Sequence, residues 1–142
     1  LGGTAIGTVP KIDGVKEGYH TLSHHGKNPE RLKQLEIVER ATLAAFFGFI
    51  GKLQEMKEGD SNLLERSQIF LGSNLGNASG HLTNNLPALL AGGGFKHGSH
   101  LAFDTKDNYP LSNLFVSMMQ RMGIAQESFG GFSGTMRGLE MS

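Results

Sequence analysis

The feature that most constrains the fold is one long amphipathic helix predicted in the first half of the chain. Asn28 can cap a helix, Pro29 suits its first position, and Glu30 favours the positive end of its dipole. The pattern predicts a helix from Asn28 to about Lys57 that stops at Gly59. Its apolar stripe is Leu32, Leu35, Val38, Ala45, Phe46, Phe49, Ile50, Leu53 and Met56. Such a helix needs a sheet or other helices to cover it, so we expect its phenylalanine face to be buried.

Short apolar runs bounded by polar residues and glycine predict two buried strands, at residues 67–72 and 86–91. Residues 100–103 are a candidate third strand, and residues 5–9 a short strand in an extended entry segment. A second helix is predicted from Ser112, its cap, to Met122, followed by a surface tail. The order helix, strand, strand, strand, helix indicates an α/β fold. In open α/β sheets, ligands bind at the carboxyl ends of strands.

Composition narrows the possible functions. The 142 residues carry 13 basic and 13 acidic side chains, so the formal net charge is zero. This balance argues against binding of nucleic acid, which needs clustered positive charge. The longest largely apolar run, residues 41–50, is far shorter than the roughly 20 residues of a membrane span. Cysteine is absent, which excludes disulfides and thiolate metal ligands. Because the chain begins without methionine, we interpret residues 1–142 as a single-domain fragment of a longer protein, with residues 1–27 as its entry segment.

Six histidines fall in only three places, and the first is residues 19–26. His20 and His24 are four residues apart, so on a helical turn both imidazoles lie on one face and can share a metal ion. His25 points elsewhere and is a candidate for contact with a second ion or a substrate anion, while Ser23 can orient a ring nitrogen. The alternative is a group of surface or interdomain histidines that hydrogen-bond to parts of the protein outside this chain.

The second histidine lies in a run of small and polar residues that follows the first predicted strand. Small residues let the backbone approach a ligand, while Asn74, Asn77 and His81 offer carbonyl oxygens and an imidazole. The alternative is an ordinary tight turn in which asparagine tolerates left-handed geometry.

The third place is residues 92–100, which begin with three glycines. The run lacks the Gly-Lys-Ser/Thr ending of a nucleotide-binding P-loop, so we exclude that function. Lys96 can still meet a phosphate or sulfate oxygen as a point charge. The alternative is a loop between strands, with Lys96 and His97 exposed.

Three blocks of the sequence, in order, resemble the HXXSHH (DUF1552) family of bacterial proteins. They are the H-x-x-S-H-H pattern at residues 20–25, the block at 72–81 and the block at 89–98. The resemblance covers about residues 19–139. It implies an exported protein, periplasmic or on the cell surface.

More distantly, the family is similar to the alkaline phosphatase and sulfatase superfamily. This resemblance implies the C-terminal portion of a layered α/β sandwich whose metal ligands are an Asp-x-x-x-His pair, an Asp-His pair and a further histidine. Here His20 occupies the position of the first aspartate. Glycine, and not aspartate, precedes His81, and the last histidine corresponds to His97 or His100. The nucleophile of the superfamily is expected upstream of this chain, so no catalytic residue is assigned.

The resulting expectation is a metal-dependent domain that hydrolyses phosphate or sulfate esters of small molecules or polymers. Zinc is the expected ion, because neutral imidazole suits it. The expected metal ligands are His20, His24 and His81. The expected substrate-binding or supporting residues are Ser23, His25, Asn74, Asn77, Lys96, His97 and His100. The rival expectation is an exported binding protein that retains the fold without the chemistry.

Overall fold

The computed structural model describes residues 11–139, which form mixed α/β structure and confirm the α/β class expected from the sequence. The predicted strand at residues 5–9 lies outside this range. Two compact units are present: the chain up to Lys52 with Asn74–Thr83, and Leu53–Ser73 with the chain from Asn84 onward. The described elements are α1 (Tyr19–Ser23), α2 (Pro29–Glu55), β1 (Lys57–Glu58), β2 (Ser61–Asn62), α3 (Leu63–Arg66), β3 (Gln68–Gly72), β4 (Ala88–Gly92), α4 (Ser112–Arg121), β5 (Ser128–Phe129) and β6 (Phe132–Ser133).

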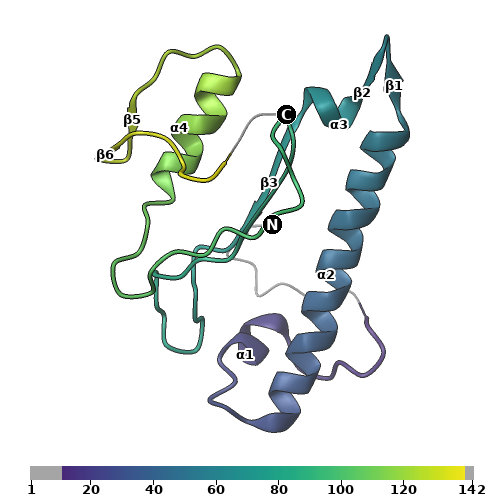
Figure 1. Ribbon diagram of the computed structural model, residues 1–142. Coiled ribbons are helices and arrows are strands. Elements are labelled where there is room, and N and C mark those ends of the chain that lie inside the picture. Colours follow the sequence, from purple (N-terminus) through teal and green to yellow (C-terminus); the bar gives the residue numbers. More distant parts are fainter. Residues whose placement is uncertain (1–10, 140–142) are drawn as a thin grey trace. The chain divides into compact units, whose positions relative to one another are not determined.

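The predicted long helix is present as α2, which runs without interruption for 27 residues (Figure 1). The Asn28 side chain accepts hydrogen bonds from the amides of Glu30 and Arg31, at 3.0 and 3.1 Å, and so caps the helix as predicted. Arg31 also pairs with Glu17 at 3.2 Å. This contact ties the segment before α1 to the first turn of α2.

The prediction that the phenylalanine face of α2 is buried is wrong for most of that face. Phe49 and the neighbouring Phe47 are 48% and 58% exposed, Phe46 is half-buried, and Val38 is the buried residue of the helix. In the first half of α2, Ile37 lies against Gly14, in the segment before α1. Helical spacing shows which side chains share a face, but the covering of that face depends on segments far away in the sequence.

Two of the predicted strands are present and pair with each other as β3 and β4. The pairing is antiparallel, from Gln68 opposite Gly92 to Gly72 opposite Ala88. The loops that follow β3 and β4 therefore leave from opposite ends of the pair. In a parallel sheet, the carboxyl ends of neighbouring strands lie at one edge. In this antiparallel pair they lie at opposite ends, so the two loops are not brought together in this way. The third predicted strand is also wrong, because residues 100–103 are irregular.

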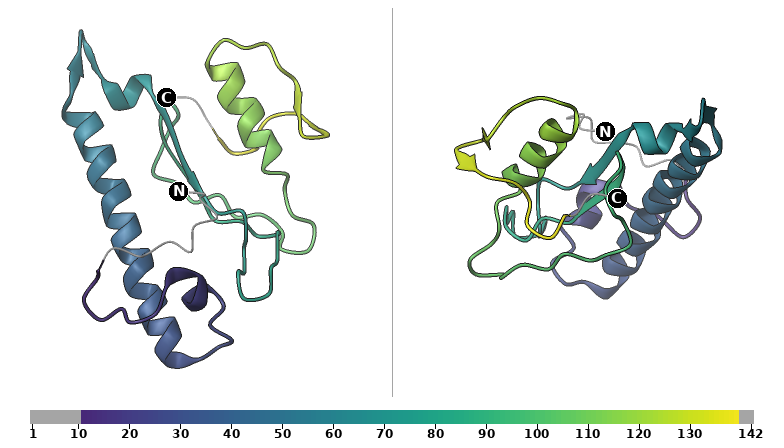
Figure 2. Two further views of the ribbon diagram at one scale, coloured as in Figure 1. Left: turned by 180° about the vertical axis from the view of Figure 1, so that it is seen from behind. Right: turned by 45° about the horizontal axis from the view of Figure 1, so that its top comes forward.

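In the second unit, α4 packs on the small hairpin that follows it in the chain (Figure 2). Val116 is fully buried in α4. Phe115 contacts Phe70 of β3 and Phe129 of β5 edge to face, with ring centroids 5.5 and 5.7 Å apart. Residues 128–133 thus form a hairpin, β5–β6, that packs on α4 and was not predicted, and the residues from 134 to 139 are irregular and mostly exposed, as expected of a surface tail.

Helix caps differ from prediction at both shorter helices of this unit. α3 starts with a capping box that we did not predict: the Asn62 side chain accepts from the Glu65 amide at 2.9 Å, and the Glu65 carboxylate accepts from the Asn62 amide. α4 is preceded by Leu111, with no side-chain cap. The predicted cap at Ser112 is therefore wrong, because Ser112 already lies inside the helix.

Replacing Asn62 with alanine is expected to lower the free energy of unfolding by about 1–2 kcal/mol, because the buried cap of α3 is lost. Ser112→Ala is the matched control and should change it by less than about 0.5 kcal/mol, since this side chain caps nothing. Urea denaturation of both variants measures the difference. Equal losses would show that the capping box does not stabilise α3.

Candidate functional site

The first unit brings together the three histidines predicted as metal ligands. His20 and His24 lie one helical turn apart at α1, with ring centroids 4.7 Å apart. The ring of His81 lies 4.8 Å from that of His24, and their Nε2 atoms are 3.4 Å apart. Residues 57 positions apart in the sequence thus form one cluster.

A tight turn presents His81 to the other two histidines. The Asn77 side chain accepts a hydrogen bond from the Gly80 amide at 3.0 Å, and Asn77 forms a β-bridge with Leu82. His81 itself adopts a left-handed conformation, with φ of 51°, which is uncommon for residues other than glycine. Such conformations persist where the surroundings impose them, and they cluster at functional sites. Asn77, predicted to contact a ligand, is instead engaged in shaping this turn.

One further side chain joins the turn to the segment after α1. The Ser79 hydroxyl accepts a hydrogen bond from the Gly26 amide at 3.3 Å. Gly26 and Lys27 both have positive φ, of 55° and 64°, so the chain turns sharply just after His25. Sequence reasoning missed Ser79, because a serine in a glycine-rich turn carries no local sign of a contact 53 residues away.

The remaining residues predicted in this unit make backbone contacts or are exposed. His25 Nδ1 accepts a hydrogen bond from the Lys27 amide at 3.0 Å, so Nε2 is its available ring nitrogen. The Ser23 hydroxyl donates to the backbone carbonyl of His20 at 2.8 Å, and not to a ring nitrogen. Asn74 is exposed.

The electrostatics of the cluster favour a neutral imidazole at its centre. The pKa of His24 is lowered, first by desolvation and then by the neighbouring His20 and His81. The lowered pKa favours the neutral form of His24, which is the form of imidazole that binds metal ions. Beside the cluster, burial and then Glu39 raise the pKa of Tyr19.

An NMR titration of the metal-free protein should show His24 taking up its proton below the pH of about 6.5 that is typical of free histidine. Replacing both His20 and His81 with glutamine removes two positive neighbours, so the midpoint of His24 should rise. It should rise only part of the way, because desolvation is the larger cause. An unchanged midpoint in the double variant would show that the three rings do not interact in solution.

The third group of predicted residues belongs to the second unit and follows β4. The His97 ring donates from Nε2 to the Gly92 carbonyl at 2.8 Å, which leaves the lone pair of Nδ1 as its available acceptor. Phe95 is buried and anchors the loop, while Lys96 and His100 are exposed. His97 thus stabilises the glycine turn at the end of β4 through a local hydrogen bond.

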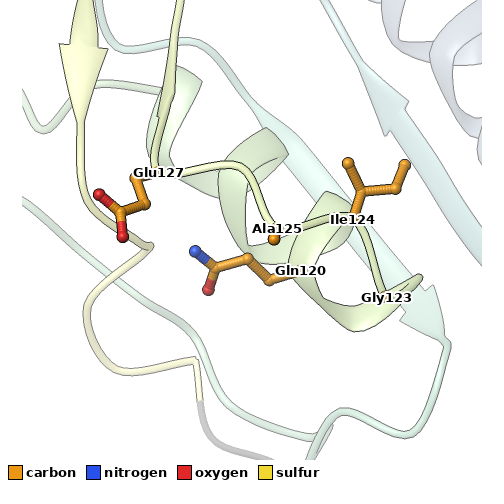
Figure 3. A pocket seen from close by; sticks show the side chains of 5 residues that line it. All are labelled: Gln120, Gly123, Ile124, Ala125 and Glu127. Atoms are coloured by element: carbon orange, nitrogen blue, oxygen red, sulfur yellow. The ribbon is translucent and has the colours of Figure 1, made fainter.

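A hollow of about 360 Å³ lies at the end of α4 in the second unit. Figure 3 shows the polar ends of the Gln120 and Glu127 side chains on one side of it and Ile124 on the other. The Gln120 amide donates to the Gln126 carbonyl at 2.8 Å. This hollow contains no residue predicted from the sequence and no histidine, so it is not the candidate site.

Among residues 11–139, no set of three or more histidine, aspartate or glutamate side chains already converges on one metal position. The cluster is therefore a close pair, His24 and His81, with the ring of His20 packed against His24. In the same range, no helix has both the length and the apolar character needed to cross a membrane. No family model, curated protein or solved structure matches the chain.

Proposed function

We propose that the first unit binds a divalent metal ion, zinc by preference, through His24 and His81, with His20 as the third ligand. The observation that supports this is the 3.4 Å separation of the two Nε2 atoms. Two nitrogens bound to a tetrahedral zinc at about 2.0–2.1 Å lie about 3.3–3.4 Å apart. The same separation is longer than the roughly 2.7–3.2 Å of a good hydrogen bond from nitrogen. The distance between the His24 and His81 nitrogens thus fits two ligands of one zinc ion better than it fits a hydrogen bond.

His20 completes the set by a change of rotamer. It is exposed, it lies one turn before His24, and its ring already contacts the His24 ring. A side chain so placed rotates at a cost of about 1 kcal/mol, which is small beside the energy of a zinc–imidazole bond. Three histidines around one zinc leave a fourth position open, the pattern of catalytic zinc sites.

The chemistry proposed for this site is hydrolysis of phosphate or sulfate esters by an exported protein with an alkaline phosphatase-like sandwich fold. Bound zinc would polarise an ester oxygen and favour attack on it. His25 supports the proposal from its own side, because its engaged Nδ1 leaves an N–H at Nε2 in the neutral ring. That N–H is a donor suited to an oxyanion. The proposal draws further support from the H-x-x-S-H-H pattern at residues 20–25.

Calorimetric titration of the chain with zinc tests the proposal. We expect one zinc ion to bind per chain. The free energy of unfolding should rise by about 2.7 kcal/mol when free zinc is 100 times the dissociation constant. Magnesium at the same concentration should give no response, because it prefers oxygen ligands in octahedral geometry. Absence of zinc binding would contradict the metal site. Zinc binding without turnover of 4-nitrophenyl phosphate or sulfate by the full-length protein would favour a binding protein over a hydrolase.

A further inference from the structure

A second open hollow, of about 500 Å³, lies in the second unit, beside the irregular segment predicted as a strand. Its volume falls in the range of about 300–1,000 Å³ that is usual for small-molecule sites. Its apolar side is formed by Leu101, Ala102 and Phe103. Its polar groups are His100, Asp104 and Arg137. None of its lining residues belongs to the histidine cluster of the first unit.

The guanidinium of Arg137 is held over a stack of aromatic rings. It lies 5.1 Å from the centroid of the Tyr109 ring, and Tyr109 stacks on Phe103 with centroids 4.7 Å apart and planes 21° apart. The Tyr109 hydroxyl donates to the Thr135 carbonyl at 2.9 Å, which fixes the ring under the cation. Contact with an aromatic face stabilises a cation without neutralising it.

The backbone around Arg137 is fixed from inside the unit. Asn113, which is buried, donates to the Ser133 carbonyl at 3.1 Å. The Met136 amide donates to the Ser117 hydroxyl at 2.9 Å. Gly138 has a φ of 80° and lies so close to Leu101 that an added Cβ would be 3.1 Å from that side chain. These contacts order the segment that carries Arg137 along the wall of the hollow.

Arg137 and Asp104 are the charged residues of the hollow, and they do not form an ion pair with each other. Within residues 11–139, Arg137 forms no ion pair. Asp104 Oδ1 accepts from the amides of Lys106 and Asp107, at 2.7 and 2.8 Å. These bonds, with the Asp107 amide first, lower the pKa of Asp104 and keep it ionised. Its Oδ2 accepts no hydrogen bond from the described part of the chain, so it is available to a ligand.

We propose that this hollow binds an acidic sugar, that is, a hydroxylated ring that carries a phosphate, sulfate or carboxylate group. The planar fork of Arg137 suits two oxygens of such a group. The carboxylate of Asp104 repels a bare anion but accepts hydrogen bonds from hydroxyl groups, so the ligand must supply both. Phe103 offers an apolar surface to the C–H face of the ring.

A ¹⁵N-resolved NMR titration of the chain, without added metal, tests the proposal with glucose 6-phosphate as the probe. We expect shifts at the Arg137 side chain and along residues 100–104. Glucose and inorganic phosphate should each bind at least about tenfold more weakly, because each supplies only one of the two required groups. Equal affinity for glucose 6-phosphate and inorganic phosphate would overturn the proposal.

Variants separate a built site from general attraction of anions. Arg137→Gln should weaken glucose 6-phosphate binding by about 10- to 100-fold. Arg137→Lys should also weaken it, while keeping a cation over Tyr109 and hence the fold. Asp104→Asn keeps an oxygen that can accept from the turn amides, and it should tighten binding of inorganic phosphate. Lys57→Gln, which removes one exposed positive charge of the same unit outside the hollow, is the control and should change affinity by less than about twofold. Equal losses for Arg137→Gln and Lys57→Gln would also overturn the proposal.

Discussion

Replacing Gly92 with alanine is expected to lower the free energy of unfolding by more than about 4 kcal/mol, a loss seen only when a backbone or core feature is broken. Gly92 has a φ of 75°, and an added Cβ would lie 2.2 Å from the Leu64 carbonyl oxygen and 2.3 Å from that of Ser67. Both are backbone atoms, and the Leu64 carbonyl already accepts from the Gly93 amide at 3.2 Å. The clash is relieved only by separating the end of β4 from the segment between α3 and β3.

Gly98→Ala is the matched control for this prediction. Gly98 has a φ of 94°, but an added Cβ would have no atom within 4 Å. This variant pays the conformational cost alone, about 1–2 kcal/mol. Urea denaturation of both proteins gives the difference due to the clash. Equal losses in the two variants would show that the backbones of β4 and α3 do not approach so closely.

Removing either close histidine should abolish most of the zinc affinity. We expect His24→Ala and His81→Ala each to weaken zinc binding by about 100-fold or more, since loss even of a residue that only supports a ligand costs about 10- to 100-fold. If both imidazoles bind one ion, as proposed, the loss in the double variant should differ from the sum of the two single losses. Calorimetry on the four proteins gives the coupling between the two residues.

Asp13→Asn is the control for zinc binding, because it removes an exposed carboxylate from the same unit but outside the cluster. Its zinc affinity should equal that of the unchanged protein. Zinc affinity that is unchanged in either histidine variant would exclude a shared site.

The parts of the fold that the sequence predicted are those determined by neighbouring residues. The cap at Asn28 and the spacing of apolar residues define α2, and short apolar runs define β3 and β4. The exposure of Phe47 and the antiparallel register of β3 with β4 depend on contacts distant in sequence. Apolar runs are alike in parallel and antiparallel strands that are buried, so the strand direction was not available from the pattern.

The candidate site divides in the same way. The spacing of His20 and His24 brings them together because residues 19–23 form the helix α1, where the sequence had predicted an extended entry segment and left a helical turn open. The approach of His81 was expected from the small polar residues around it and from the resemblance to the metal ligands of the superfamily. Two contacts have no sequence signature, because each joins distant segments through one side chain. They are the hydrogen bond between Ser79 and Gly26 and the cation–π contact of Arg137 with Tyr109.

The placement of His24 and His81 on separate segments has a consequence for how the first unit holds together. In the protein alone, the hydrogen bond between Ser79 and Gly26 and the contact of the two rings connect these segments. An ion shared by the two imidazoles would act as a removable crosslink that closes a loop of 57 residues. Like a disulfide, it would restrict the unfolded chain more than the folded one. Zinc supply would then govern how often the turn at Asn74–Thr83 opens, and with it how readily a protease cuts there.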